Sequence, residues 1–233
     1  MEHELVPADY GQMNLRTAEE FDRKVKECFA AAFPAVARQI IETCDTSAGI
    51  CIEVGSGTAL LSIELARQSA MTVYCLEKAP AMFHVGIRNI QKAGLMARIR
   101  PVAGDAHEIP FDDGFADLVV SRGSFHFWED QARVLEEILR VLKKNGTGFV
   151  GGGFGHGHSP ADLRRMTDLR DRSLGNGADC YRSPHKMEQA LAAAGVKAYR
   201  LFHDETGLWV LFRKRIHKGT IPRSSTLPKG EPL

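Results

Sequence analysis

The segment "EVGSGTALLSIELA", residues 53–66, places two glycines between an apolar strand-like run and a run of helical periodicity. Gly55 and Gly57 allow a tight turn and let a ligand approach the backbone, and the N–H groups of the helix that follows favour negative charge. The turn does not complete the dinucleotide fingerprint G-x-G-x-x-G, because the sixth position is Leu60. It also lacks the Gly-Lys-Ser/Thr ending of a phosphate-binding loop. A tight turn without any ligand is the structural alternative.

Around this turn, apolar strand-like runs alternate with amphipathic helical runs. The strands show no polar alternation, which is typical of a parallel sheet that is buried on both faces. We therefore predict an α/β fold: a doubly wound, mostly parallel seven-stranded sheet with an antiparallel C-terminal hairpin strand and helices on both faces. The predicted strands include residues 49–54, 72–77, 99–104, 116–121 and 147–152, the helices residues 59–68, 81–94, 130–144, 159–174 and 183–195, and the hairpin turns near residues 205–207.

The N-terminal part reads differently from the alternating part. Residues 1–20 are polar and irregular, a helix follows, and Pro34 should break or kink it before a second helix that begins at Ala35. The helix over residues 130–144 should stop at Asn145-Gly146. We predict an N-terminal helical lid or arm over residues 1–45, a main domain over 46–215 with an acceptor-side insertion at about 154–183, and a flexible tail over 216–233.

Composition narrows the class of protein. The chain has 233 residues, a formal net charge of +1 and five scattered cysteines without CxxC spacing. We expect a protein of a reducing compartment, with no signal pattern and no apolar run long enough to span a bilayer, and hence a cytoplasmic location without a membrane partner. A nucleic-acid partner is not expected, since the arginines of one helical run alternate with acidic residues, as on a solvated face (Arg164, Arg165, Arg170, Arg172).

Two acidic residues follow the next strands. Glu77 ends the second strand, where a carboxylate can accept hydrogen bonds from both ribose hydroxyls of an adenosine. Asp105 follows the third strand in "VAGDAHEIPF", where it could accept from an exocyclic amine beside apolar neighbours. The alternatives are a turn-forming Asp105 and a Glu77 that caps a helix in solvent.

These features together resemble a known family. The pattern Glu53-x-Gly55-x-Gly57, the acidic end of the second strand, "GDAHEIPF" and "FADLVVSRGSFHFWED" look like the Rossmann-like (class I) S-adenosylmethionine-dependent methyltransferases of small-molecule type. The resemblance covers residues 48–153 and implies S-adenosyl-L-methionine as cofactor. One departure is Ala59, where the family often has a third glycine, and we expect alanine to be tolerated there.

The resemblance also implies roles for particular residues. Gly55 and Gly57 would line the methionine moiety, Glu77 would hold the ribose, and Asp105 would face the adenine amine. Glu53 would orient the loop or meet the methionine amino group. The predicted cofactor residues are Glu53, Gly55, Ser56, Gly57, Glu77, Lys78, Gly104, Asp105, Ala106, Ser121 and Arg122.

The methyl acceptor is less constrained by the sequence. The segment Ser121–Ser124 lacks the Asn/Asp-Pro-Pro-aromatic motif of amino-methylating members, which argues against adenine, cytosine or glutamine amides as acceptors. We predict a small-molecule acceptor; a homodimer is left open. The alternatives are a non-catalytic binding module for S-adenosylmethionine or S-adenosylhomocysteine that serves a partner protein, and a thiol or metalloid methyltransferase, for which only Cys180 lies in a suitable loop. The predicted acceptor-binding residues are Tyr10, Ser124, Phe127, Trp128 and Phe154, with His126 as a catalytic candidate.

The stretch "FVGGGFGHGHSPADL", residues 149–163, comes at the carboxyl end of the fifth strand. Its glycines would make room for an acceptor and free the loop. His156 and His158 are then candidates for acceptor contact or proton removal, because histidine titrates near neutral pH. A metal site would need a third ligand that the sequence does not offer, so none is predicted. The alternative is a solvated loop with two ordinary histidines.

Overall fold

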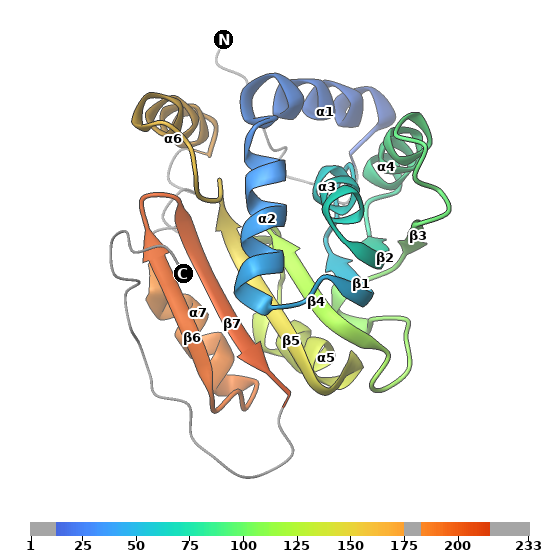
Figure 1. Cartoon of the computed structure of the whole chain (residues 1–233), viewed down its shortest axis with the longest axis vertical. Coiled ribbons are helices and arrows are strands. Elements are labelled where there is room, and N and C mark those ends of the chain that lie inside the picture. The colour runs from blue at the N-terminus through green and yellow to red at the C-terminus, as the bar shows by residue number, and fades with distance from the viewer. Residues whose placement is uncertain (1–12, 175–182, 215–233) are drawn as a thin grey trace.

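The computed structural model describes residues 13–174 and 183–214. Seven strands form one sheet in the order β3-β2-β1-β4-β5-β7-β6 (Figure 1). The first five pair in parallel, and β7 lies antiparallel between β5 and β6. This confirms the predicted mostly parallel sheet with its antiparallel hairpin. The strands are β1 Ala48–Val54, β2 Ala70–Glu77, β3 Ile99–Ala103, β4 Ala116–Arg122, β5 Leu142–Gly153, β6 Tyr199–Asp204 and β7 Gly207–Arg213.

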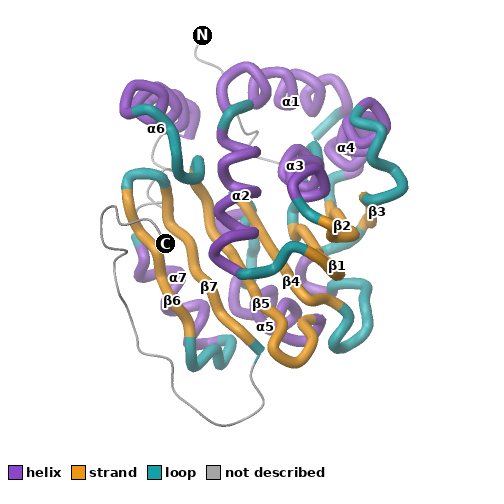
Figure 2. Tube along the Cα trace, viewed as in Figure 1, coloured by secondary structure: helices purple, strands orange, loops and turns teal. Residues whose placement is uncertain are grey.

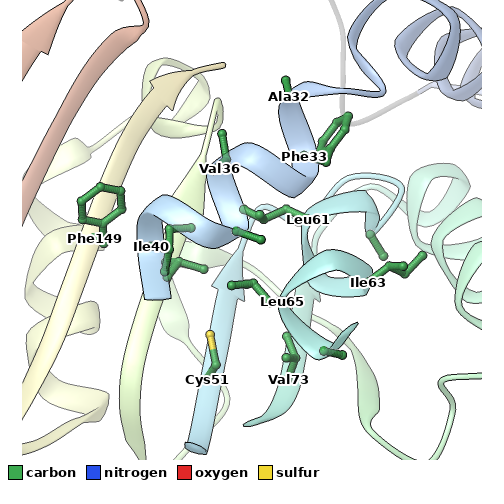
Figure 3. Close-up of a cluster of buried hydrophobic side chains, with 14 of the residues drawn as sticks. Ala32, Phe33, Val36, Ile40, Cys51, Leu61, Ile63, Leu65, Val73 and Phe149 are labelled. Atoms are coloured by element: carbon green, nitrogen blue, oxygen red, sulfur yellow. The ribbon is translucent and has the colours of Figure 1, made fainter. Parts of the chain in front are cut away.

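Helices cover both faces of the sheet (Figure 2). They are α1 Leu15–Phe29, α2 Ala32–Cys44, α3 Leu60–Gln68, α4 Pro80–Lys92, α5 Gln131–Val141, α6 Pro160–Leu174 and α7 Pro184–Ala193, with short 3-10 turns η2 Ala106–Glu108 and η3 Phe125–Phe127. On one face α2 and α3 pack Ile40, Leu61 and Leu65 against Cys51 and Phe149 of the sheet (Figure 3). On the other, α5 and α7 form the second core cluster. Burial on both faces explains why the strands are continuously apolar.

The N-terminal helices differ from the prediction in their bounds. Residues 15–20 are helical, because the Asn14 side chain accepts the Thr17 N–H at 3.0 Å and caps α1. The break between the helices falls at residues 30–31, and α2 begins at Ala32, three residues earlier than predicted. Pro34 lies in the first turn of α2, where its missing N–H costs no helical hydrogen bond.

The junction of α5 and β5 also differs from the prediction. The helix ends at Val141 and the strand begins at Leu142, so Asn145-Gly146 lies inside β5 and terminates no helix. Asn145 has a φ of 65°, and the register to β4 shifts between Ala116 and Leu118. The pair forms a bulge in the strand, a use of Asn-Gly that helical periodicity cannot distinguish from a stop.

Strand order reverses between β1 and β4, which are neighbours in the sheet although two strands separate them in the sequence. In open α/β sheets, ligands bind outside the carboxyl ends of the strands at this reversal. Within the described ranges, no helix is long and apolar enough to cross a membrane. The predicted acceptor residue Tyr10, the loop residue Cys180 and the tail 216–233 lie outside the described residues.

Candidate active site

The turn after β1 is held against the end of β2. The Gly55 and Ser56 N–H groups both donate to the Leu76 carbonyl, at 2.9 and 3.0 Å. Gly55 has a φ of 69°, and a Cβ there would lie 2.5 Å from the Ser124 Cβ. Only glycine fits both conditions, so this turn brings β1 and the end of β4 together at the strand reversal.

A cavity of about 580 Å³ opens at this point. The glycine turn, the ends of β2, β3 and β5, and the helices α1 and α2 all contribute residues to its lining. Its volume is within the usual range for small-molecule sites. Fourteen predicted site residues line it: Glu53, Gly55, Ser56, Gly57, Glu77, Lys78, Gly104, Ala106, Arg122, Ser124, His126, Phe127, Trp128 and Phe154.

Glu77 is buried at the cavity wall, with 3% of its surface exposed. Its Oε2 accepts the Gly57 N–H at 2.7 Å, and its Oε1 accepts the Ala79 N–H at 2.8 Å. Burial raises the pKa of this carboxyl, and the backbone N–H groups oppose the rise. Each carboxylate oxygen keeps a second lone pair, so Glu77 can still accept from a bound hydroxyl.

Glu53 is the second buried acid of the site, 2% exposed. Burial raises the pKa of its carboxyl to about 8, against hydrogen bonding from Ser62 and the charge of Arg122. The Ser62 hydroxyl, on α3, donates to Glu53 Oε2. A carboxyl buried at a cavity wall and held partly protonated is suited to meet a cationic ligand group, because the cation would favour its ionised form.

Asp105 does not line the cavity, contrary to the role that the resemblance implies. Its carboxylate receives the Lys78 ammonium at 2.7 Å, and its Oδ1 accepts the His107 backbone N–H at 2.9 Å and lies 2.6 Å from Nδ1 of the His107 ring. Asp105 thereby caps η2, and the pKa of its carboxyl is lowered by these hydrogen bonds despite some desolvation. His107 lines the cavity instead.

The end of β4 contributes a serine pair and a cation. Ser121 is fully buried, lines no part of the cavity, and shares a hydrogen bond with Ser124. Ser124 in turn donates to the Val54 carbonyl at 3.0 Å, which ties β4 to β1. Arg122 lines the cavity, donates to the Gly153 carbonyl, and lies with its guanidinium carbon 4.6 Å from the Phe33 ring centre. Ser121 therefore does not line the cavity, and it holds the lining residue Ser124 in place through their hydrogen bond.

His126 and Phe127 of η3, with the following Trp128, line the cavity near the end of β4. His126 lies against Phe127, with ring centres 4.1 Å apart, and Trp128 packs edge-on against Phe125. Burial lowers the pKa of His126 to about 4, so its ring is neutral at neutral pH. It can accept a proton but is a weak base, because general-base catalysis is most effective when the pKa lies near the working pH.

The structure does not bring His156 and His158 to the cavity. His156 lies 3.3 Å from Asp204, which raises the pKa of its ring, and His158 hydrogen-bonds the Phe154 carbonyl. The cause is Gly155, whose φ of 78° turns the chain where a Cβ would meet the α2 backbone at 2.6 Å. Neither histidine is therefore placed for acceptor contact or proton removal.

The glycines of β5 serve close packing rather than room for an acceptor. A Cβ on Gly151 would lie 2.2 Å from the Leu208 carbonyl oxygen, and one on Gly153 would lie 2.2 Å from that of Thr206. Both contacts come from β7 and the turn before it. The glycine run is thus explained by the antiparallel neighbour strand, and only its end, at Gly153 and Phe154, lines the cavity.

Several lining residues were not predicted as site residues. Phe29 and Phe33 read as helical core positions, and Phe29 stacks on Phe154 with ring centres 5.7 Å apart. Arg170 read as part of a solvated face, but its side chain is only 12% exposed and its guanidinium carbon lies 5.4 Å from the Phe154 ring centre. Each side chain enters the site through a contact between segments far apart in the sequence, and local spacing does not report such contacts.

Comparison with known proteins identifies this combination of fold and site. A methyltransferase-domain family model matches residues 52–150. A solved structure of a candidate S-adenosyl-L-methionine-dependent methyltransferase from Methanococcus maripaludis is 34% identical, with a TM-score of 0.80 over 88% of this chain and 95% of that chain. The doubly wound fold is thus that of class I methyltransferases. The chain belongs to the S-adenosylmethionine-dependent methyltransferase family, whose cofactor is S-adenosyl-L-methionine.

Two curated relatives are similar over shorter stretches. The malonyl-[acyl-carrier protein] O-methyltransferase of Geobacter sulfurreducens is 29% identical over 158 residues, which are 66% of this chain and 58% of the relative. The 2-methyl-6-phytyl-1,4-hydroquinone methyltransferase of Arabidopsis thaliana is 34% identical over 96 residues, which are 41% of this chain and 27% of the relative. The chain therefore spans from about a quarter to somewhat over half of the length of these relatives.

Proposed function

We propose that this chain transfers a methyl group from S-adenosyl-L-methionine to a small-molecule acceptor. The observation that carries the proposal is the continuity of one cavity, which extends from the glycine turn and Glu77 to the apolar walls of α1, α2 and β5. Such a cavity can hold a donor and an acceptor side by side, and alignment of two reactants supplies much of the rate enhancement that this reaction needs. The family relationship supports the same activity.

The cofactor end has groups that suit each part of the donor. Glu77 would accept hydrogen bonds from the ribose hydroxyls, and Glu53 would contact the methionine ammonium. The backbone of Ser56 would lie along the methionine part of the cofactor. His107 rather than the Asp105 carboxylate would stand beside the adenine. The other predicted cofactor residues keep supporting positions around these groups: Gly55, Gly57, Lys78, Gly104, Ala106, Ser121 and Arg122.

When bound, the cofactor would supply a methyl group on a positively charged sulfur. The acceptor's lone pair would form the new bond to the methyl carbon, and the electrons of the broken carbon–sulfur bond would remain on the sulfur and neutralise it. The protein's task is then alignment and exclusion of water. Phe29, Phe33 and Phe154 provide apolar walls for this task. His126 is neutral and would take a proton only from an acceptor that loses it readily.

The chemistry of the walls favours an acceptor with an apolar body. Five apolar side chains line the side of the cavity opposite the glycine turn: Phe21, Val25, Phe29, Phe33 and Phe154. The Arabidopsis relative is named for 2-methyl-6-phytyl-1,4-hydroquinone, a small molecule, which supports a small acceptor. The Geobacter relative is named for a malonyl group on acyl-carrier protein. Ser124, Phe127 and Trp128 would contact the acceptor near the methyl group. Cytoplasmic location and homodimer formation stay predictions.

Binding and transfer test the proposal separately. The protein should bind S-adenosylhomocysteine in calorimetry, and with methyl-labelled S-adenosylmethionine and a metabolite extract it should label a small molecule. Absence of binding would contradict the assigned site. Binding without labelled product would favour the alternative, a non-catalytic module that serves a partner protein.

A further inference from the structure

A polar cluster beside the cavity, which Thr58 lines, joins α1, α4 and the glycine turn. Its Lys26 side chain is 43% exposed, and its other side chains are buried. Its members are Asp22 and Lys26 of α1, Asn89 of α4 and the Thr58 carbonyl of the turn. Asp22 is 8% exposed and Asn89 is 7% exposed, so both are removed from bulk water. Buried polar groups of this kind are costly to leave unpaired, and a complete network fixes the geometry of the elements that it joins.

Asn89 is the centre of this cluster. Its amide nitrogen donates to the Thr58 carbonyl and to Asp22 Oδ1, both at 2.9 Å. Its amide oxygen accepts from Lys26 Nζ at 2.7 Å, and Lys26 also reaches Asp22 Oδ2 at 2.6 Å. Both donor hydrogens and the acceptor of Asn89 are thus engaged, which leaves the side chain one orientation.

The cluster has the cofactor turn on one side. Thr58 is buried and follows Gly57, whose N–H binds Glu77. Helix α4 approaches this turn closely, since a Cβ on Gly86 would lie 3.3 Å from the Gly57 carbonyl oxygen. A shift of α4 relative to the turn would therefore reach the groups proposed to hold the cofactor.

The other side of the cluster is α1, which lies beside α4 (Figure 1). Apolar contacts of Met13 and Ala18 with Met82 and Val85 seat one helix on the other. In this position, Phe21, Val25 and Phe29 of α1 line the cavity. Asp22 and Lys26 thus share a helix with the apolar wall of the acceptor side.

We propose that Asn89 is a positioning residue that couples the cofactor turn to α1. Cofactor binding then stabilises α1 in its observed position, packed against α4 with its apolar residues lining the cavity. In turn, this position of α1 strengthens cofactor binding by the same factor, because coupling between two sites is reciprocal. The proposal rests on the proposed function, in that the glycine turn holds the cofactor. It adds a link between the two ends of the site: occupancy of the cofactor turn and completion of the acceptor wall favour each other.

Calorimetry with S-adenosylhomocysteine tests the coupling in four proteins: wild type, Asp22→Ala, Asn89→Ala and the double variant. Asp22→Ala leaves the Asn89–Thr58 hydrogen bond in place, yet it should weaken binding at the turn about tenfold, within the usual range of coupling factors. In the Asn89→Ala background, Asp22→Ala should weaken binding little further, because the hydrogen-bonded connection between α1 and the cofactor turn through Asn89 is already lost. Amide exchange of residues 55–60 in the cofactor-free protein should rise in Asp22→Ala.

Glu19→Ala is the matched control. Glu19 forms a 2.6 Å ion pair with Arg88 that joins the same two helices, but it is exposed and does not touch the cluster. The affinity of the Glu19→Ala protein for S-adenosylhomocysteine should stay within about twofold of that of the wild type. Asp22→Asn, which keeps the side-chain size, replaces Asp22→Ala if that variant does not fold.

Three outcomes would overturn the coupling. One is wild-type affinity in a folded Asp22→Ala protein, another is equal loss in Asp22→Ala and Glu19→Ala, and the third is additive loss in the double variant. Failure of the wild type itself to bind S-adenosylhomocysteine would instead contradict the proposed function, so the two failures are distinguishable.

Discussion

Two buried acids, Glu53 and Glu77, line the cavity and are the residues that we propose to hold the methionine ammonium and the ribose of the cofactor. They end neighbouring strands, and the charge of Glu77 contributes to the raised pKa of Glu53. Carboxyls of this kind are costly to bury in ionised form unless a ligand or backbone donors compensate them. Among the described residues, backbone N–H groups of Gly57 and Ala79 donate to Glu77, and Ser62 donates to Glu53.

The pH dependence of stability should reveal Glu53. Its folded-state pKa of about 8 lies above the ordinary value of 4.5 for this carboxyl, so the folded state retains a proton that the unfolded state loses. Its contribution to the free energy of unfolding is fully present below about pH 4.5 and is lost as the pH rises through about 8. Glu53→Gln should therefore gain stability relative to the wild type between pH 5 and pH 8.5, by up to a few kcal/mol, in urea unfolding without ligand. A constant difference between the two proteins would contradict this.

Glu77 and Asp105 should behave differently although both were predicted to bind the cofactor. Glu77→Gln places an amide where two backbone N–H groups need acceptors, and it should weaken S-adenosylhomocysteine binding by about 10- to 100-fold. Asp105→Asn removes a largely exposed ion pair with Lys78, and it should change the affinity by less than about threefold. Calorimetry on both variants, with circular dichroism as a check on folding, decides between them. Equal losses would return Asp105 to the adenine site.

At this scale the sequence predicted the residue types but not all of their contacts. Glu77 and Gly55 follow from their place at strand ends, since the chain order fixes what meets at the strand reversal. Asp105 does not, because its carboxylate is taken by Lys78 and the cap of η2. Which of several nearby donors a carboxylate chooses depends on side-chain geometry that no spacing rule contains.

Among the elements, β5 is the most constrained. Its glycines let β7 approach closely. The strand begins at Leu142, directly after α5, and contains the Asn145-Gly146 bulge. The apolar runs predicted that a helix and a strand exist here. The predicted end of the helix was wrong because the Asn145-Gly146 pair lies in the strand and does not stop the helix. Helical periodicity and an Asn-Gly pair indicate a helix stop as readily as a bulge, so only pairing with β4 resolves the choice.

Gly151→Ala should destabilise the protein through this strand pair. The new Cβ would meet the Leu208 carbonyl oxygen at 2.2 Å and the Trp209 Cα at 2.7 Å, so backbone must move, at a cost of about 1–3 kcal/mol or more. Gly157→Ala is the comparison, since no atom lies within 4 Å and only its φ of 90° is unfavourable, at about 1–2 kcal/mol. Thermal and urea unfolding of both variants measures the order, and a smaller loss for Gly151→Ala would contradict the packing account.

For the whole molecule, the cavity exists only once distant segments have met. Phe29 of α1 stacks on Phe154 after β5, and Arg170 of α6 covers the same ring. The sheet and its site edge could be predicted from strand order. The acceptor wall could not, because it depends on how three helices pack across the sheet rather than on any local pattern.

Cysteine reactivity reports on this global packing. Cys44, Cys51 and Cys75 are buried in one core, and burial raises the pKa of Cys44 and Cys75 to about 12 and that of Cys51 well above its usual value. At pH 8 these three cysteines should resist iodoacetamide until the protein unfolds, and the partly exposed Cys28 should react before them. Peptide mass spectrometry across a urea series follows each site. Native-state labelling of Cys51 at the rate of Cys28 would contradict a single cooperative core.

The place of β7 between β5 and β6 has a consequence for synthesis on the ribosome. β5 ends at Gly153, but the strand that covers its free edge begins at Gly207. At roughly 5–20 residues per second, the intervening chain takes about 3 to 10 s to emerge. During that interval the nascent protein carries an apolar strand with unpaired backbone groups, the kind of surface that chaperones bind and that aggregates by edge pairing. Completion of the sheet therefore waits on β7, the last strand in chain order among the described residues.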